Sequence, residues 1–269
     1  MDRLPFNKLM LVILAALVVW GCATNSVEKG PADTALKPQR PVLRVGVTPN
    51  YPPMIFKLNN KITGMEADFA FLLGDALGRD VAFVELPFTT LTNALMEGRI
   101  DIIMSGMTIT QARQVRVSFT DSYLRIGQVA MMRVQDASKY NSLMRIRECD
   151  GPVGVVKGTT GEAYVRANFT KASPIITVED VRDGARILNN RRVDLFVYDV
   201  PAIVWLVSEN ETTLKGFWEP LNDEYLAWAV NRDDQTLLRA VNTALANWKR
   251  SGTVNEVVKK WLPYWKSSE

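Results

Sequence analysis

The chain has 269 residues, of which 32 are Lys or Arg and 29 are Asp or Glu, and its formal net charge is +3. So small a charge, without a basic block or a basic–aromatic stripe, gives no case for binding nucleic acid. The chain contains no histidine and two cysteines, Cys22 and Cys149, so the commonest general base is missing and no cysteine cluster can hold a metal. We therefore expect neither a metal nor another cofactor.

The amino-terminal residues have the pattern of a targeting segment. Arg3 and Lys8 accompany an apolar run of 12 residues, Leu9 to Trp20. This run is too short to span a bilayer, which takes about 20 residues, but it suits a signal-peptide core. The segment that follows, Val19-Trp20-Gly21-Cys22, resembles the bacterial lipobox, which implies a signal peptide at residues 1–21 and a lipid on Cys22. The alternative is an ordinary signal peptide with a chance cysteine.

Lipidation would anchor the protein to a membrane on the extracytoplasmic face of the cell envelope. Ala23 lacks the aspartate that resembles an inner-membrane retention signal, which favours the outer membrane in a cell that has two. Residues 22–40 have no apolar periodicity and contain two prolines, so they are predicted to form a flexible tether. With Cys22 acylated, Cys149 has no disulfide partner and is expected to be a buried, inert thiol.

Strands and helices are predicted to alternate in two units. The first unit has strands at 42–47, 81–86 and 102–104 and helices at 66–77 and 90–97, and a long apolar strand at 127–134 leads out of it. The second has strands at 152–156, 174–178 and 194–198 and helices at 162–168, 180–189 and from 202. A strand at 225–230 then returns, and helices at 233–249 and 254–261 close the chain.

This alternation is typical of an α/β fold whose mostly parallel sheets are covered on both faces. Two units joined by two extended crossings predict two lobes, one from residues 41–130 with 229–269 and the other from residues 131–228. A double connection acts as a hinge, and the cleft between two lobes is where small ligands bind.

The stretch from Asp101 to Tyr123 is predicted to run from a strand through a turn into a helix. Backbone N–H groups and hydroxyls gathered at such a turn can hold an anion, and a guanidinium can grip a carboxylate with two parallel hydrogen bonds. The residues that would form this corner are Ser105, Gly106, Thr108, Thr110 and Arg113. Two simpler interpretations stay open, in which Thr110 caps a helix and Arg113 is a solvated helix residue.

Several segments in this order resemble a known family. They are Gly64 to Phe69, Gly106 to Thr110, Val153 to Thr160, Val193-Asp194 with Asp199, and the closing helices from Asn242 to Trp261. Together they resemble the solute-binding proteins of amino-acid ABC transporters, which have the periplasmic-binding-protein type II fold. The resemblance covers Val42 to Trp261. It implies a monomer that captures an amino acid by cleft closure and delivers it to an ABC permease.

The resemblance also implies a role for individual residues. The arginine at position 113 would hold the α-carboxylate of the ligand with help from Gly106, Thr108 and Thr160, and the aspartate at position 199 would hold the α-ammonium. Tyr51 and Phe88 would sandwich the ligand side chain, unless they are plain core aromatics. The full set of expected ligand-binding residues is Tyr51, Phe88, Ser105, Gly106, Thr108, Arg113, Thr160 and Asp199.

Other residues limit or compete with this interpretation. Family members that bind basic amino acids resemble one another in an acidic residue where this chain has Thr48, which weighs against a basic ligand. Glu66 and Asp68 are interpreted as favourable charges at a helix start, and Thr159 as a residue of the turn.

We expect no catalytic residue. The alternatives are an enzyme on this scaffold, similar to cyclohexadienyl dehydratase, for which Glu162 is a candidate carboxylate, and a sensory or envelope binding protein. Because the chain ends at Glu269, no fused catalytic domain is expected.

Overall fold

The computed structural model describes residues 40–264, which belong to one compact unit. The expected signal peptide, the lipid site at Cys22 and nearly all of the expected tether lie outside the described residues. Within the described part of the chain, no helix combines the length and the apolar content that crossing a membrane requires.

The first lobe is built on a five-stranded sheet in the order β5-β1-β6-β15-β7. Its strands are β1 (Val42–Val47), β5 (Asp80–Glu85), β6 (Ile102–Ile103), β7 (Val117–Phe119) and β15 (Ala229–Asn231). Its helices are α1 (Met65–Leu77), α2 (Phe88–Met96), α3 (Gln111–Gln114), α8 (Gln235–Ser251) and α9 (Thr253–Trp261). A small sheet of β2 (Asn50–Tyr51), β3 (Ile55–Leu58) and β4 (Lys61–Thr63) adjoins α1, and the sequence did not predict these strands.

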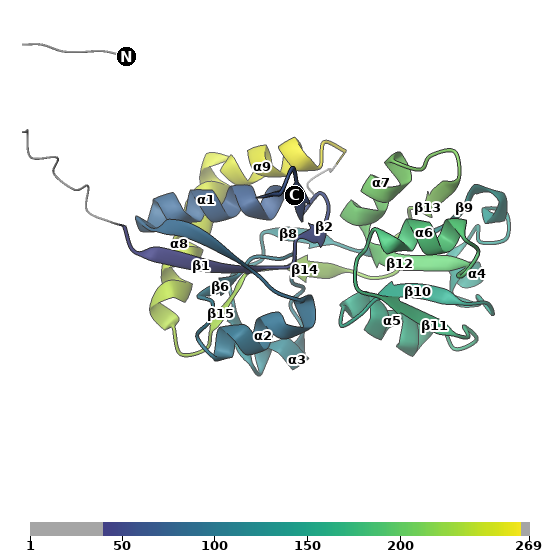
Figure 1. The fold of residues 1–269 in the computed structure, drawn as a ribbon, viewed down its shortest axis with the longest axis horizontal. Coiled ribbons are helices and arrows are strands. Elements are labelled where there is room, and N and C mark those ends of the chain that lie inside the picture. The colour runs from purple at the N-terminus through teal and green to yellow at the C-terminus, as the bar shows by residue number, and fades with distance from the viewer. Residues whose placement is uncertain (1–39, 265–269) are drawn as a thin grey trace, which may run out of the picture. The chain divides into compact units, whose positions relative to one another are not determined.

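The second lobe repeats this plan with the order β11-β10-β12-β9-β13. Its strands are β9 (Gln128–Arg133), β10 (Val153–Val156), β11 (Ile175–Val178), β12 (Leu195–Asp199) and β13 (Leu214–Phe217). Its helices are the short 3-10 helix η1 (Val134–Asp136) and the α-helices α4 (Leu143–Arg147), α5 (Thr160–Asn168), α6 (Asp183–Asn189) and α7 (Val200–Ser208). Figure 1 shows the two sheets side by side, each with helices around it.

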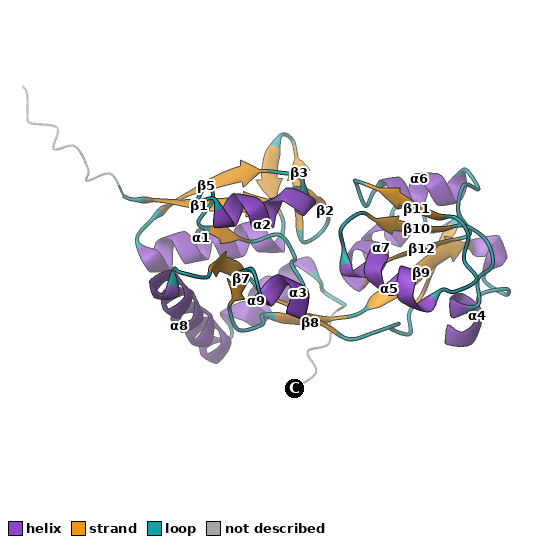
Figure 2. Cartoon of the chain, turned by 90° about the horizontal axis from the view of Figure 1, so that it is seen from below, coloured by secondary structure: helices purple, strands orange, loops and turns teal. Residues whose placement is uncertain are grey.

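Two short strands connect the lobes, β8 (Leu124–Ile126) and β14 (Glu224–Leu226), and they pair with each other in antiparallel fashion (Figures 1 and 2). Each lobe sheet has one strand that runs against its neighbours, β15 in the first and β9 in the second. These are the strands that follow the connections along the chain. The expected mostly parallel sheets are therefore confirmed, with one reversed strand in each.

The prediction of one continuous strand at 225–230 is wrong. Residues 227 and 228 separate β14 from β15, and their backbone N–H groups bond to loop residues of the first lobe and not to a neighbouring strand. Ala227 N donates to Met107 O at 3.1 Å, and Trp228 N donates to the Thr120 hydroxyl at 3.1 Å. The strand expected at 127–134 was interpreted as the crossing between the lobes, and this is also wrong. The corresponding strand, β9, begins at Gln128 and pairs with β12 and β13, so it belongs to the sheet of the second lobe.

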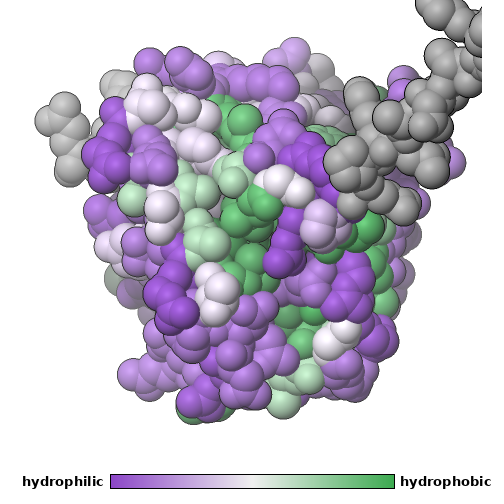
Figure 3. All heavy atoms as spheres, turned by 90° about the vertical axis from the view of Figure 1, so that its left-hand side faces the viewer, coloured by the Kyte–Doolittle hydropathy of each residue, from purple (hydrophilic) through white to green (hydrophobic). Residues whose placement is uncertain are grey.

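The helices of the first lobe follow the apolar spacing of the sequence. In α8, Asp234 caps the helix by accepting from Leu237 N at 2.9 Å, and Gly252 ends it with a φ of 86°. The buried side chains Leu237, Val241 and Leu245 recur at the helical period and pack into the main core. Figure 3 shows a face of this lobe on which hydrophilic residues surround smaller hydrophobic areas.

Candidate functional site

Asp199 and Tyr51 meet across the two lobes. Asp199 stands at the carboxyl end of β12, where α/β sheets place their ligand sites, and Tyr51 belongs to β2 of the first lobe. The Tyr51 hydroxyl donates to Asp199 Oδ2 at 2.6 Å, and both side chains are buried. A second tyrosine, Tyr198, packs edge-on against Tyr51 with 5.2 Å between ring centres. Tyr51 is thus a core aromatic whose hydroxyl contacts the expected ammonium site.

The environment of Asp199 raises its pKa to about 7. Burial is the main cause, because an ionised carboxylate loses its hydration in the protein interior. The negative charge of Glu224 raises this pKa further, while the hydroxyl of Tyr51 and the charge of Arg113 lower it in part. Asp199 would therefore gain from a cationic partner placed against it.

Gly106 faces a buried carboxylate of the protein itself. Its N–H donates to Glu66 Oε1 at 2.6 Å, and Glu66 also accepts from Tyr123 Oη and Trp228 Nε1, each at 2.7 Å. Glu66 is fully buried, and burial raises its pKa against the effect of these bonds. It is more than a favourable charge at a helix start. It ties the turn at Gly106 to the residues beside both lobe connections.

The conformation at Gly106 requires glycine. Its φ is 63°, a left-handed value that costs other residues free energy. A Cβ at this position would lie 2.7 Å from the ring of Tyr51. The absent side chain therefore makes room for Tyr51, and the N–H points toward Glu66.

Arg113 reaches from the first lobe toward the second. Thr110 caps the short helix α3 by accepting from Arg113 N at 3.2 Å, so the capping interpretation of Thr110 is confirmed. The guanidinium donates to Thr108 O at 2.9 Å and to Gly158 O of the second lobe at 3.4 Å. Its Cζ lies 5.3 Å from the ring centre of Phe88. Burial lowers the pKa of Arg113, and the charges of Glu224 and Asp199 oppose this. The side chain is partly buried and contacts Thr108, Gly158 and Phe88, which does not fit a fully solvated helix residue.

A third buried carboxylate, Glu224, joins the expected hydroxyls. Thr108 Oγ1 of the first lobe and Thr160 Oγ1 of the second donate to Glu224 Oε2 at 2.6 and 2.8 Å. Asn222 Nδ2 donates to Glu224 Oε1 at 2.9 Å, and Gln128 Nε2 donates to Thr160 Oγ1 at 3.0 Å. Sequence reasoning missed Glu224, Asn222 and Gln128. The available signal was an acidic residue directly before the apolar return strand.

Ser105 lies behind the cleft. The residue is 2% exposed, and its hydroxyl oxygen accepts from Thr48 N at 2.9 Å, which ties the turn to the end of β1. The Thr48 hydroxyl donates to Leu86 O at 2.8 Å. Ser105 thus positions the turn. Tyr51 and Asp199 bond to each other across the lobes, Arg113 bonds to Gly158 of the second lobe, and Thr108 and Thr160 both bond to Glu224 in the connection between the lobes.

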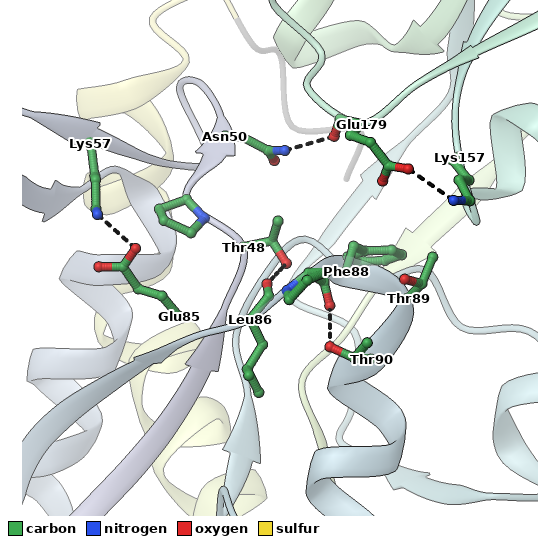
Figure 4. Close-up of a pocket in the computed structure, with 12 residues that line it drawn as sticks. Thr48, Asn50, Lys57, Glu85, Leu86, Phe88, Thr89, Thr90, Lys157 and Glu179 are labelled. Atoms are coloured by element: carbon green, nitrogen blue, oxygen red, sulfur yellow. Dashed lines mark hydrogen bonds and ion pairs between the residues drawn. The ribbon is translucent and has the colours of Figure 1, made fainter.

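A cavity of about 750 Å³ opens beside Phe88 and has walls from both lobes (Figure 4). It is lined by Thr48, Pro49, Asn50, Lys57, Glu85, Leu86, Pro87, Phe88, Thr89, Thr90, Lys157 and Glu179. Asn50 Nδ2 donates across the lobes to Glu179 O at 2.9 Å. The charged side chains at its rim pair within each lobe, Lys57 with Glu85 at 2.7 Å and Lys157 with Glu179 at 2.9 Å.

Arg113, Asp199 and Glu224 do not line this cavity. Their polar atoms bond directly to partners from the opposite lobe or from the lobe connections. The cavity is the outer part of the cleft, and the charged groups form its inner end.

Glu162 and Thr159 have structural partners at the start of α5. Glu162 Oε2 accepts from Gly158 N at 2.8 Å and Oε1 accepts from Arg166 Nη2 at 2.8 Å, while the Thr159 hydroxyl accepts from Glu162 N at 3.3 Å. These contacts agree with first-turn and capping roles. Cys149 is buried, as expected, and has no disulfide partner among the described residues; its Sγ lies 3.5 Å from Tyr140 Oη. The described residues hold no group of three His, Cys, Asp or Glu side chains that could bind a metal ion.

Comparison with known proteins identifies the family. The profile of the bacterial extracellular solute-binding proteins, family 3, matches residues 43–264. The chain belongs to this family. The expected family and the two-lobed α/β fold are therefore confirmed.

Relatives cover nearly the whole chain. The L-cystine-binding protein TcyJ of Escherichia coli K12 is 26% identical over 95% of both chains. The ABC transporter arginine-binding protein 1 of the same strain is 26% identical over 96% of this chain and 99% of the relative. The cyclohexadienyl dehydratase of Pseudomonas aeruginosa is also 26% identical, over 93% of both. Two of these three relatives are thus named as binding proteins and one as an enzyme.

Solved structures agree with the fold. An ancestral arginine-binding protein bound to arginine has a TM-score of 0.76 and 30% identity over 83% of this chain and 99% of that one. An ancestral amino acid-binding protein, described as a precursor of cyclohexadienyl dehydratase, has a TM-score of 0.75 and 32% identity over 82% and 94%.

Proposed function

We propose that this protein captures an amino acid between its two lobes and delivers it unchanged to an ABC importer. One observation carries the proposal, the placement of a guanidinium from the first lobe and a buried carboxylate from the second at the inner end of one cleft. Burial lowers the pKa of Arg113, and the charges of Glu224 and Asp199 oppose this lowering, so both carboxylates lie within electrostatic reach of the guanidinium. A zwitterion needs such a pair, because its two charges lose their hydration when it is buried.

Capture would exchange bonds between the lobes for bonds to the ligand. The ligand ammonium would take the place of the Tyr51 hydroxyl at Asp199, and its carboxylate would take the free N–H groups of Arg113. Phe88 lies between Arg113 and the outer cavity, so the side chain of the ligand would pass over its ring. Because the partners belong to different lobes, ligand binding would favour the arrangement in which the lobes meet.

The relatives support a binding function, since most are named as binding proteins for amino acids. The alternative, an enzyme similar to the Pseudomonas dehydratase, needs a general acid or base free to reach a substrate. Glu162 already accepts from Gly158 N and Arg166, and Glu224 accepts from three side chains of the protein. We expect mass spectrometry to recover a bound amino acid unchanged, and turnover of the ligand would refute the binding function.

We further propose that the ligand-binding lobes work at the membrane as a lipid-anchored monomer and pass the ligand to a permease. The support is the lipobox-like segment ending at Cys22 and the family to which the chain belongs. Replacing Cys22 by serine should release the protein from membranes in cell fractionation. A variant that stays bound would contradict lipidation.

Calorimetric titration of residues 40–269 with the twenty amino acids tests the binding site. Arg113→Ala should weaken binding about a hundredfold or more, since a buried carboxylate loses its charged donor. The matched control is Arg116→Ala, which removes an exposed guanidinium three residues further on that bonds to Asn93. Equal affinities of the two variants would refute the role of Arg113.

A further inference from the structure

Glu224 is a buried charged residue at the inner end of the cleft for which the proposed function has no use. It is the first residue of β14, the connection that returns from the second lobe, and the residue is 6% exposed. Thr108 comes from the first lobe, Thr160 from the second and Asn222 from the connection itself, and all three donate to it. Glu224 therefore touches every part of the molecule that meets at the cleft.

These bonds fix how the two hydroxyls can face a ligand. A threonine hydroxyl has one proton to donate and two lone pairs that accept. Both Thr108 and Thr160 give their proton to Glu224 Oε2, and Thr160 also accepts from Gln128 Nε2. What remains for a ligand is acceptor capacity. While these bonds hold, neither hydroxyl can donate to a ligand carboxylate, and both favour N–H groups.

The charged side chains of the inner cleft also favour a positively charged ligand, because carboxylates outnumber guanidiniums there. Among the described residues at this end, Arg113 faces the two carboxylates of Asp199 and Glu224. Burial lowers the pKa of Arg113 and raises that of Asp199; the negative charge of Glu224 opposes the first shift and adds to the second, so it acts on both proposed ligand anchors. Glu66, behind Gly106, adds a further carboxylate of the same sign. The rim contributes no net charge, since each lysine there pairs with a glutamate.

We propose that Glu224 is a specificity-determining residue that makes the cleft select amino acids with one positive charge more than a neutral zwitterion, and disfavour those with acidic side chains. The inference rests on the proposed amino-acid binding function. It also bears on Thr48, which lacks the carboxylate that the resemblance associates with basic ligands. Glu224 supplies a carboxylate to the same cleft from a different strand.

The test compares ligands that differ in charge and little in shape. Dissociation constants are measured by calorimetry for arginine against citrulline, glutamine against glutamate, and asparagine against aspartate. The wild-type protein should prefer the more positive member of each pair that it binds. Glu224→Gln keeps the size of the side chain and removes its charge, and it should reduce each preference on the order of tenfold.

The matched control is Asp223→Asn, which removes a carboxylate from the neighbouring residue. Asp223 is exposed and pairs with Arg125 at 2.8 Å, so this change should leave the preferences unaltered. Preferences that are the same in Glu224→Gln and in the wild type would overturn the inference while leaving amino-acid binding intact. If Glu224→Gln does not fold, the wild-type measurements still test the inference, because a preference for the more negative ligand of each pair would overturn it. A wild-type protein that binds no amino acid would refute the proposed function itself, and this inference with it.

Discussion

Replacing Asp199 by asparagine should stabilise the ligand-free protein at pH 8 although it removes a proposed ligand anchor. The ordinary pKa of the carboxyl group is 3.8, and in the folded protein it is about 7, mainly because of burial. Below pH 3.8 the group is neutral in both the folded and the unfolded chain. Between pH 3.8 and pH 7 the unfolded chain releases the proton and the folded chain keeps it, so the free energy of unfolding falls as the pH rises.

The magnitude follows from the size of the pKa shift. A shift of about 3 units at about 1.4 kcal/mol per unit amounts to about 4 kcal/mol above pH 7. About one of these pH units lies below pH 5, so roughly 1.4 kcal/mol of unfolding free energy is already lost at that pH. About 3 kcal/mol more should be lost between pH 5 and pH 8. Asparagine has no charge at any pH and keeps an oxygen that can accept from Tyr51. The advantage of Asp199→Asn over the wild type should therefore grow by about 3 kcal/mol over this range.

The assay is urea unfolding followed by tryptophan fluorescence, at several pH values, on protein freed of ligand by unfolding and refolding. Asp101→Asn is an informative control. Burial alone would raise the pKa of Asp101, but hydrogen bonds from Arg44 and its charge together lower it. The stability that Asp101 contributes is present above its ordinary pKa and is lost as the pH falls, so its removal should destabilise the protein at pH 8. A difference between Asp199→Asn and the wild type that does not change with pH would refute the reasoning.

Three further predictions concern the same region. Gly106→Ala should cost about 2 kcal/mol of unfolding free energy and weaken ligand binding, because a methyl group would strain the backbone and push the neighbouring tyrosine ring. Gly78→Ala, at a φ of 64° with open space around it, should cost only about 1 kcal/mol in the same urea assay and leave binding unchanged. Tyr123→Phe should cost about 2 kcal/mol, because the buried Glu66 loses a donor, and a loss below about 0.5 kcal/mol would contradict that role. Ligand affinity, measured by calorimetry, should rise between pH 6 and pH 8, because the ammonium binds the ionised form of Asp199. Below pH 7 the rise should be up to about tenfold per pH unit, and an affinity that does not change with pH would contradict this.

The order of elements could be predicted because its signals are local. The apolar spacing and the glycine at position 252 predicted a helix at 233–249, and α8 spans Gln235–Ser251. The first strand was predicted at 42–47, and β1 has these bounds. The break in the return strand could not be predicted, because Ala227 and Trp228 bond to residues more than a hundred positions earlier in the chain.

The same distinction separates the carboxylates of the site. Asp199 could be proposed because it ends a strand at the edge of a sheet where ligands bind. Glu66 shows no such signal, because an acidic residue at a helix start is ordinarily explained by the helix dipole. Its donors, Gly106, Tyr123 and Trp228, come from positions 40, 57 and 162 residues away. Only the folded chain brings them together, so sequence spacing carries no trace of this cluster.

Both lobe connections are held by a buried carboxylate, Glu66 or Glu224, that accepts hydrogen bonds from surrounding residues. Glu66 accepts from Tyr123 beside the first connection and from Trp228 beside the second, while Glu224 lies in the second connection and accepts from both lobes. A buried carboxylate whose donors are removed keeps the full cost of its lost hydration. Motions of the lobes that separate Thr160 from Glu224 must therefore replace that donor, by water or by the N–H groups of a ligand. A ligand rich in N–H groups can fill this need, which joins the selectivity proposed for Glu224 to the closure of the cleft.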